Sequence, residues 1–146
     1  MSRYILDTDH VTLFQHNHPN IAQRARAVGG SNIFITTVTL EEQLRGRLAG
    51  ISRVATQPER LAVAYENLRR TMLYFCSVNL LSFDDVAYNC YQSLRQQQIR
   101  IGTQDLRIAA IALANQGVVV TRNHQDFSRV PDLSLEDWTV VNFPNS

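Results

Sequence analysis

The sequence predicts an α/β fold, a three-layer α/β/α sandwich built around a mostly parallel sheet, and two observations lead to that prediction. Short apolar runs alternate along the chain with longer segments of helical periodicity. Each run is almost continuously apolar, which is typical of strands buried on both faces of a parallel sheet. The chain has 146 residues, the size of one domain, so we expect a single domain over residues 1–146.

Four runs are predicted to be strands, because each is too short for a helix and is bounded by polar or turn residues. They are Tyr4–Leu6, Ile33–Ile35, Val78–Leu81 and Val118–Val120. Four helices are predicted between them from apolar residues spaced three or four apart. They span Thr39–Gly50, Pro58–Cys76, Asp84–Gln97 and Gln104–Asn115.

All 14 basic residues are arginines, and the chain has no lysine. That absence excludes enzymes that need a Schiff-base lysine and nucleotide-binding P-loops, whose lysine contacts the phosphates. The formal net charge of +1 gives no global basic field, so an anionic partner has to be held by a local patch.

The N-terminal segment does not have the pattern of a signal peptide, and no apolar run is long enough to cross a membrane. We therefore expect a cytoplasmic protein without a membrane partner. Cys76 and Cys90 lack the spacing of a metal or redox motif, so buried and unreactive thiols are expected. His10, His16 and His18 are expected to decorate a polar helix end.

Four acidic residues stand where an open parallel sheet places its ligand site, just after strands or at helix starts. They are Asp7, Glu42, Asp105 and Asp126. Each alone has a structural explanation, because such acids are common in turns and in first helical turns, and Thr39 to Glu42 has the pattern of a capping box. Converging carboxylates, however, repel one another unless a hard cation offsets their charge, which suits Mg²⁺ or Mn²⁺.

Several segments resemble the PIN-domain ribonucleases, most closely the VapC toxins of bacterial toxin–antitoxin pairs. These are YILDTDH, FITTVTLEEQLRG, IGTQDLRIAAIALANQGVVVTRNHQDF and VPDLSLEDW, which together run almost from end to end. The resemblance implies that the four acids hold a divalent metal, with Thr121 and Asn123 as their polar supports. It also implies hydrolysis of RNA phosphodiester bonds, with transfer RNA as an expected substrate, together with a cognate antitoxin protein and pairing as a homodimer.

The sequence departs from the family pattern at the glutamate. Gln43 follows Glu42 where the family usually has leucine, and Glu41 stands beside it as a competing ligand. Helical periodicity places Glu41 closer than Glu42 to the apolar stripe of that helix. The spacing to Gly46 favours Glu42, which we take as the expected ligand.

Arginines near these acids are the expected RNA contacts, because a planar guanidinium binds phosphate in bidentate fashion or stacks on an unpaired base. Those nearest in the sequence are Arg45, Arg107 and Arg122. The alternative for each is an ordinary solvated ion pair.

Two other functions fit part of the sequence. The segment ILDTDHVTL also matches haloacid dehalogenase-type phosphatases, in which Asp7 would attack phosphate and Asp9 would act as acid or base. Those enzymes normally use a distant lysine, which this chain lacks. The other alternative is a catalytically inactive PIN-like scaffold that binds RNA; such domains usually lose an acid, whereas all four positions are filled here.

The predicted helix Pro58–Cys76 carries an apolar stripe with Tyr65, Met72, Tyr74 and Phe75. Such a stripe is usually part of the core, and the alternative is a groove for a partner protein.

Overall fold

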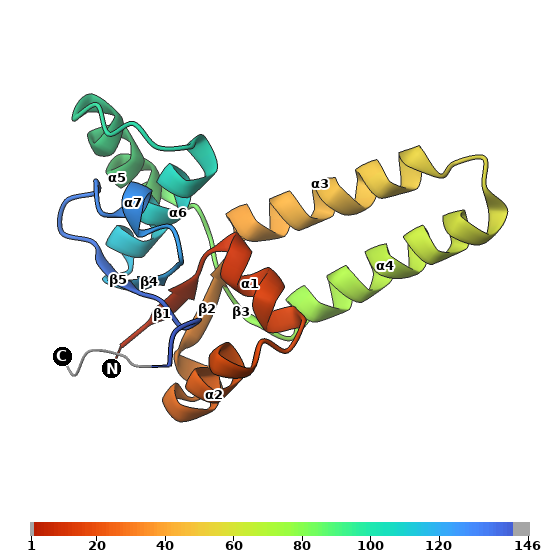
Figure 1. The fold of residues 1–146 in the computed structure, drawn as a ribbon. Helices are drawn as coiled ribbons and strands as arrows, with labels where there is room; N and C mark the ends of the chain where they lie inside the picture. Colours follow the sequence, from red (N-terminus) through yellow and green to blue (C-terminus); the bar gives the residue numbers. More distant parts are fainter. Residues whose placement is uncertain (1, 142–146) are drawn as a thin grey trace.

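The computed structural model describes residues 2–141. Within them the chain forms a five-stranded sheet whose neighbouring strands are all parallel, in the order β3-β2-β1-β4-β5 (Figure 1). The strands are β1 (Tyr4–Leu6), β2 (Ile33–Thr36), β3 (Asn79–Leu81), β4 (Val118–Val120) and β5 (Ser134–Glu136). The predicted α/β fold with a parallel sheet is confirmed, and β5 is the strand that the sequence did not predict.

Seven α-helices and one short 3-10 turn connect these strands in the described part of the chain. The helices are α1 (Thr8–Gln15), α2 (Pro19–Val28), α3 (Thr37–Arg53), α4 (Pro58–Cys76), α5 (Asp85–Gln96), α6 (Thr103–Ala114) and α7 (His124–Phe127). None of the helices within residues 2–141 is long and apolar enough to cross a membrane.

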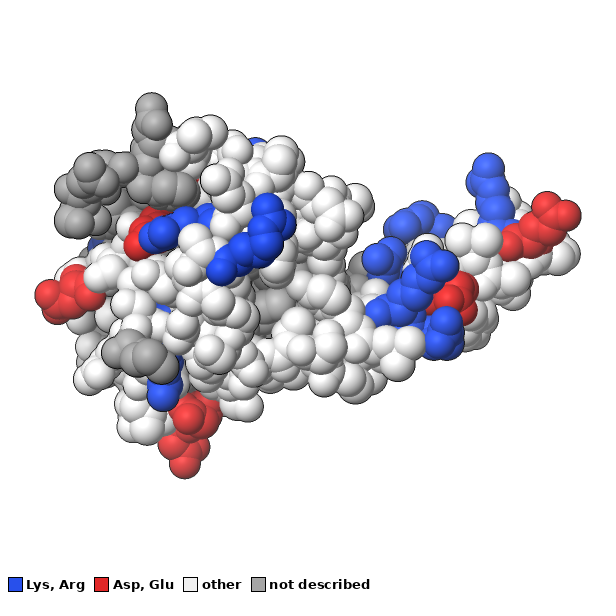
Figure 2. All heavy atoms as spheres, turned by 90° about the horizontal axis from the view of Figure 1, so that it is seen from below, with Lys and Arg blue, Asp and Glu red and all other residues white. Residues whose placement is uncertain are grey.

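Helices α3 and α4 pack against each other and project from the body of the molecule as a long arm (Figure 1). Arginine and glutamate side chains are spread along this arm, with the basic ones in excess on the face that Figure 2 presents. Residues 45–70 contain six arginines but only two glutamates, so the arm is more basic than the chain as a whole.

The helix after β2 begins earlier and ends later than the sequence predicts. Helix α3 starts at Thr37, and its cap is Thr36, whose hydroxyl accepts a hydrogen bond from the backbone N–H of Thr39 at 3.2 Å. The predicted capping box from Thr39 to Glu42 is therefore wrong. Thr36, Thr37 and Thr39 offer equivalent caps, and the helix begins at the one that directly follows the end of the paired strand residues of β2.

Both faces of the sheet are covered, as the alternation of side chains along β1 requires. Ile5 packs in a buried cluster with α5, α6 and α7, whereas Leu6 packs in a second cluster with α1 and α2. Both side chains are fully buried. The two clusters make the three layers of the predicted sandwich.

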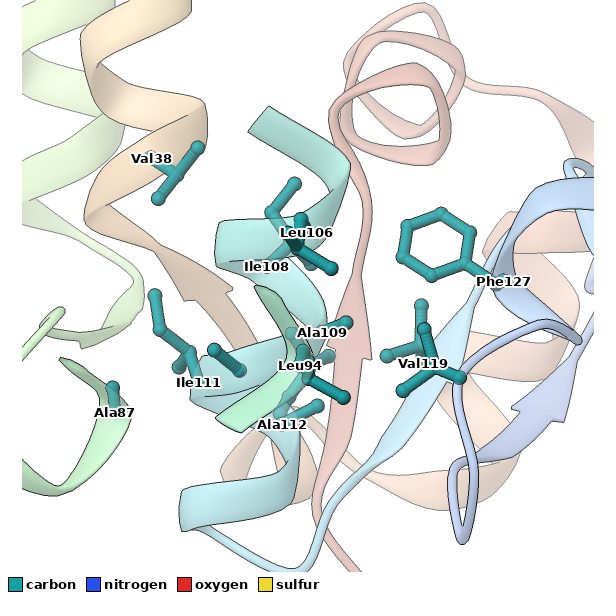
Figure 3. Packing of buried hydrophobic residues seen from close by; sticks show 13 residues of the cluster. Val38, Ala87, Leu94, Leu106, Ile108, Ala109, Ile111, Ala112, Val119 and Phe127 are labelled. Carbon is teal, nitrogen blue, oxygen red and sulfur yellow. The ribbon is translucent and has the colours of Figure 1, made fainter. Parts of the chain in front are cut away.

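Helix α6 is the most deeply buried helix of the body. Ala109 and Ala112 have small side chains, so the helix lies close to the sheet, and Ile108 and Ile111 are fully buried beside them. Figure 3 shows these residues packed between α5 and the side chain of Val119 in β4. This packing fixes the first turn of α6, where Asp105 lies.

Two predictions about single residues were wrong. His10 lies inside α1 and is fully buried instead of decorating a helix end, because its face of α1 packs on the sheet. Cys76 is exposed at the last residue of α4, and Cys90 is only half-buried, so neither thiol lies deep in the core.

Candidate active site

Asp7 stands at the junction of β1 and α1 and is 5% exposed. Its carboxylate caps α1, because Oδ1 accepts a hydrogen bond from the backbone N–H of His10 at 2.8 Å. Oδ2 accepts a hydrogen bond from the hydroxyl of Thr121, just past β4, at 2.6 Å. The side chain is therefore held from two neighbouring strands at the carboxyl edge of the sheet.

Glu42 lies in the second turn of α3 and faces the same junction. Its Oε1 accepts a hydrogen bond from the hydroxyl of Thr8 at 2.8 Å, and the Thr8 hydroxyl also lies 2.9 Å from that of Thr39. Thr8 directly follows Asp7 in the chain. The contact therefore brings the start of the arm to the edge of the sheet.

Glu41 points to a different set of partners. Its carboxylate accepts hydrogen bonds from Arg45 at 2.6 Å and from Gln104 at 3.2 Å. Chiefly because of the Gln104 hydrogen bond, the pKa of Glu41 lies below its usual range. Glu41 is therefore ionised, and its charge is offset by Arg45. Helical periodicity describes only the face of a helix, so it could not reveal that Glu41 has these partners and that Glu42 does not.

Asp105 lies in the first turn of α6 and is half-buried. Burial raises its pKa to about 6, and the negative charges of Asp7, Glu42 and Asp126 add to the shift, while a hydrogen bond from Asn123 opposes it. The four acids that the sequence singled out therefore lie close enough to repel one another. We refer to Asp7, Glu42, Asp105 and Asp126 as the carboxylate cluster.

Thr121 and Asn123 connect the members of the cluster. The Thr121 hydroxyl donates to Asp7 and accepts a hydrogen bond from the backbone N–H of Asn123 at 2.8 Å. The Asn123 amide donates to Asp126 at 3.0 Å and, more weakly, to Asp105 at 3.5 Å. These two polar residues set the positions of three of the four acids.

The donor set of the cluster fits a hard divalent cation, because it consists of carboxylate oxygens without a thiolate or imidazole. As placed, however, no three His, Cys, Asp or Glu side chains among residues 2–141 already surround one ion position. Mg²⁺ usually retains several water ligands and is bound directly by only one or two carboxylates. The residues thus fit an ion held partly through water.

His10 is the residue near the site that sequence reasoning misplaced. Its Nε2 accepts a hydrogen bond from the backbone N–H of Trp138 at 3.2 Å, which leaves the proton of the neutral ring on Nδ1. Nδ1 lies 3.6 Å from Oδ1 of Asp7 and has no hydrogen-bond partner within the described residues. The contact with Trp138 spans 128 positions of the chain, so no local pattern could have revealed it.

The three arginines proposed from the sequence all lie near the cluster, and each has a local partner. Arg45 pairs with Glu41, and Arg107 donates to Gln104 at 2.8 Å. Arg122 donates two hydrogen bonds to the carboxylate of Asp9, of 2.7 Å and 3.0 Å. Asp9 is thereby held in an exposed ion pair and is not among the acids whose charges act on Asp105.

The model of the PIN domain matches residues 4–133, so the chain belongs to the PIN-domain family. It is 28% identical to Ribonuclease VapC1 of Haemophilus influenzae (strain R2866) over 144 residues, which cover 93% of this chain and 98% of the relative. It is 27% identical to the tRNA(fMet)-specific endonuclease VapC of Salmonella typhimurium, over 94% of this chain and 99% of that protein.

Solved structures give the same family. The fold matches the DNA-bound VapBC structure from Salmonella typhimurium with a TM-score of 0.74 and 25% identity, covering 94% of this chain and 99% of that chain. It matches VapBC-1 from nontypeable Haemophilus influenzae with a TM-score of 0.73 and 28% identity, covering 94% and 98%. The predicted resemblance to PIN-domain ribonucleases of the VapC type is confirmed.

Proposed function

We propose that this protein is a divalent-metal-dependent endoribonuclease that acts as the toxin of a toxin–antitoxin pair. The observation that carries the proposal is the convergence of four acids from three helices and a strand end, where burial and mutual repulsion raise the pKa of Asp105 to about 6. The similar proteins are named as ribonucleases and a transfer-RNA endonuclease, in agreement with this chemistry.

The carboxylate cluster would hold Mg²⁺ or Mn²⁺, the two ions that best suit its oxygen donors. PIN-domain nucleases generally use a divalent metal. Such an ion lowers the pKa of water, so that hydroxide is present near neutral pH, and offsets negative charge on the phosphate.

The side chains around the cluster position its oxygens for this task. Both oxygens of Asp7 accept hydrogen bonds, one from Thr121 and one from the backbone N–H of His10. Thr8 holds one oxygen of Glu42, and Asn123 holds one oxygen of Asp126. A carboxylate of the cluster then accepts a hydrogen bond from the attacking water and orients it towards phosphorus. The chemistry needs no covalent enzyme intermediate.

The RNA would be contacted by Arg45, Arg107 and Arg122 around the cluster. Arg107 is the best placed of the three, because it donates its hydrogen bond to the neutral Gln104, whereas the other two would first have to leave a carboxylate. Transfer RNA is the substrate class that one relative's name supports. An RNA substrate also agrees with the cytoplasmic location expected from the sequence.

A small antitoxin is the proposed protein partner, because similar chains were solved as VapBC complexes. Helix α4 exposes an apolar face that suits a protein partner, with Tyr65 56%, Met72 47% and Leu73 54% exposed, whereas Phe75 is buried. A homodimer, and one domain over residues 1–146, remain part of the proposal.

The phosphatase alternative is not favoured, because Asp9 is held by Arg122 away from the cluster. The inactive scaffold is not favoured either, because the four acids are all present and together. A direct test compares Asp7→Asn with Asp9→Asn in cleavage of RNA with added Mg²⁺ or Mn²⁺.

We expect Asp7→Asn to lower the cleavage rate by about 100-fold or more, since charge stabilisation at a reacting phosphate is worth that much. Asp9→Asn should stay within a few-fold of the parent protein. Chelation of the metal should abolish cleavage by the parent. An Asp7→Asn protein with full activity, or hydrolysis of a small phosphate ester that is lost in Asp9→Asn, would refute the proposal.

A further inference from the structure

A hollow of about 790 Å³ opens beside the carboxylate cluster, between α5, the α5–α6 loop and the start of α6. We call it the α5–α6 hollow. Asp126 of the cluster forms part of its lining, so the hollow and the cluster share a wall. Its volume lies within the roughly 300–1,000 Å³ of pockets that take small organic ligands.

The lining combines positive charge with a flat aromatic ring. Arg95, Arg100 and Tyr91 all face the hollow, against the single carboxylate of Asp126. The guanidinium carbons of Arg95 and Arg107 lie 5.7 Å and 5.9 Å from the centroid of the Tyr91 ring. These contacts join the hollow to Arg107, one of the proposed RNA contacts at the cluster.

Arg129 connects the α5–α6 loop, which lines the hollow, to Asp126 of the carboxylate cluster. The Arg129 guanidinium donates a hydrogen bond to the backbone carbonyl of Arg100 at 2.8 Å and lies 4.0 Å from Oδ1 of Asp126. At Gly102 an added Cβ would meet nothing within 4 Å, so the backbone leaves the rim open at that point. The loop beside the hollow is therefore held in place by contacts with the segment that carries Asp126.

We propose that the α5–α6 hollow is a subsite for an unpaired nucleotide next to the scissile bond of the RNA. This inference rests on the proposed function and deepens it. Arg95, which lies over the Tyr91 ring, would turn to the phosphate and bind it together with Arg100, and the base would take its place on the ring. A base inside a duplex cannot enter such a hollow, so the substrate is single-stranded RNA at the cut.

An acidic peptide segment of a protein partner is the competing occupant. The nucleotide is favoured because Asp126, one acid of the cluster, lines the hollow, so a bound nucleotide would lie beside the acids that act on the phosphate. The flat ring of Tyr91 also matches a base, and the two guanidiniums match a phosphate. A peptide carboxylate would use the arginines but not the aromatic ring.

The first experiment measures binding of a fluorescent single-stranded RNA to the Asp7→Asn protein, in which cleavage is blocked. The double variant Arg95→Ala/Arg100→Ala is compared with Arg69→Ala/Arg70→Ala, which removes two exposed arginines that pair with Glu66 on the arm. Both changes remove the same charge, so the control separates the hollow from a general loss of positive charge.

We expect the hollow variant to bind RNA about tenfold more weakly and its salt dependence to fall by about 0.7 in log–log slope, because the contact with one phosphate is lost. The arm variant should match the parent in both. Equal binding by parent and hollow variant would overturn the inference. So would a hollow variant that keeps its RNA affinity but loses a peptide or protein partner, because the occupant would then be protein.

A second variant tests the stacking. Tyr91→Leu keeps an apolar side chain of similar reach but removes the flat ring, and we expect KM for single-stranded RNA to rise several-fold with little change in kcat. Unchanged KM would contradict a stacked base. A melting curve for each variant checks that it is folded.

The two proposals fail in different ways. If Arg95→Ala/Arg100→Ala, made in the active protein, cuts single-stranded RNA as well as the parent does, only the subsite is overturned. A parent protein that neither binds nor cuts RNA would overturn both the proposed function and the subsite.

Discussion

Helices α6 and α4 are both long and partly apolar, yet they are used in opposite ways. Six of the 12 residues of α6 are buried, whereas only two of the 19 residues of α4 are, Thr71 and Phe75. The first turn of α6 carries Asp105 of the carboxylate cluster, and the middle of α4 exposes large apolar side chains. The comparison indicates that the carboxylate cluster is built on the buried core, while the arm exposes apolar side chains to solvent.

The largest difference between the two helices should be in stability. Ile111→Ala in α6 removes a fully buried side chain next to the sheet and should lower the free energy of unfolding by about 3 kcal/mol, as cavity-forming substitutions do. Urea unfolding of both proteins measures the change.

The matched control is Leu73→Ala in α4, whose side chain is 54% exposed. Because little apolar surface is lost from the core, the free energy of unfolding should change by less than about 1 kcal/mol. Equal losses for the two variants would contradict the division between core and arm.

Binding of Mn²⁺ should stabilise the region around the carboxylate cluster and leave the arm unchanged. Filling the cluster with Mn²⁺ offsets its repulsion and should stabilise the fold by about 2.7 kcal/mol at 100 times the dissociation constant. Hydrogen exchange should slow at the first turn of α6 and at the start of α1, and stay unchanged in the outer half of the arm. The Asp105→Asn protein should gain less from Mn²⁺, and uniform protection of both regions would count against a local site.

The smallest predicted effect is a change of stability with pH, caused by the titration of Asp105. The pKa of Asp105 is about 6 in the folded state, against the 3.8 of an ordinary aspartate, so without metal the folded state binds the proton more tightly than the unfolded state does. Stability should therefore fall as pH rises from about 4 to 6, by about 1–2 kcal/mol for a partly exposed group.

Asp105→Asn should remove this fall and be the more stable protein at pH 7. Thermal melting at several pH values, without metal, measures it. A parent protein whose stability changes with pH in the same way as that of the variant would contradict the electrostatic account of the cluster.

Local patterns predicted those parts of the fold that short-range physics determines. Burial of apolar side chains determines the runs that form β1, β2 and β4 and the periodicity of α6. The parallel topology then predicts that the acids which follow these strands lie at one edge of the sheet. Strand β5 was missed because Ser134–Glu136 is a half-exposed edge strand with a single apolar residue.

Contacts between distant segments could not be predicted. The hydrogen bond of His10 with Trp138 and the ion pair of Asp9 with Arg122 each join positions more than 100 residues apart. The same limit left Glu41 and Glu42 unresolved, since the contact that distinguishes them comes from Thr8, in another helix.

That pair of adjacent glutamates allows the most direct test of the central claim. The measurement is the rate of single-turnover cleavage of single-stranded RNA with Mg²⁺ or Mn²⁺ by the parent, Glu42→Gln and Glu41→Gln proteins. We predict a loss of about 100-fold or more for Glu42→Gln and a change of no more than a few-fold for Glu41→Gln. Equal rates for Glu42→Gln and the parent, or a larger loss for Glu41→Gln, would contradict the account.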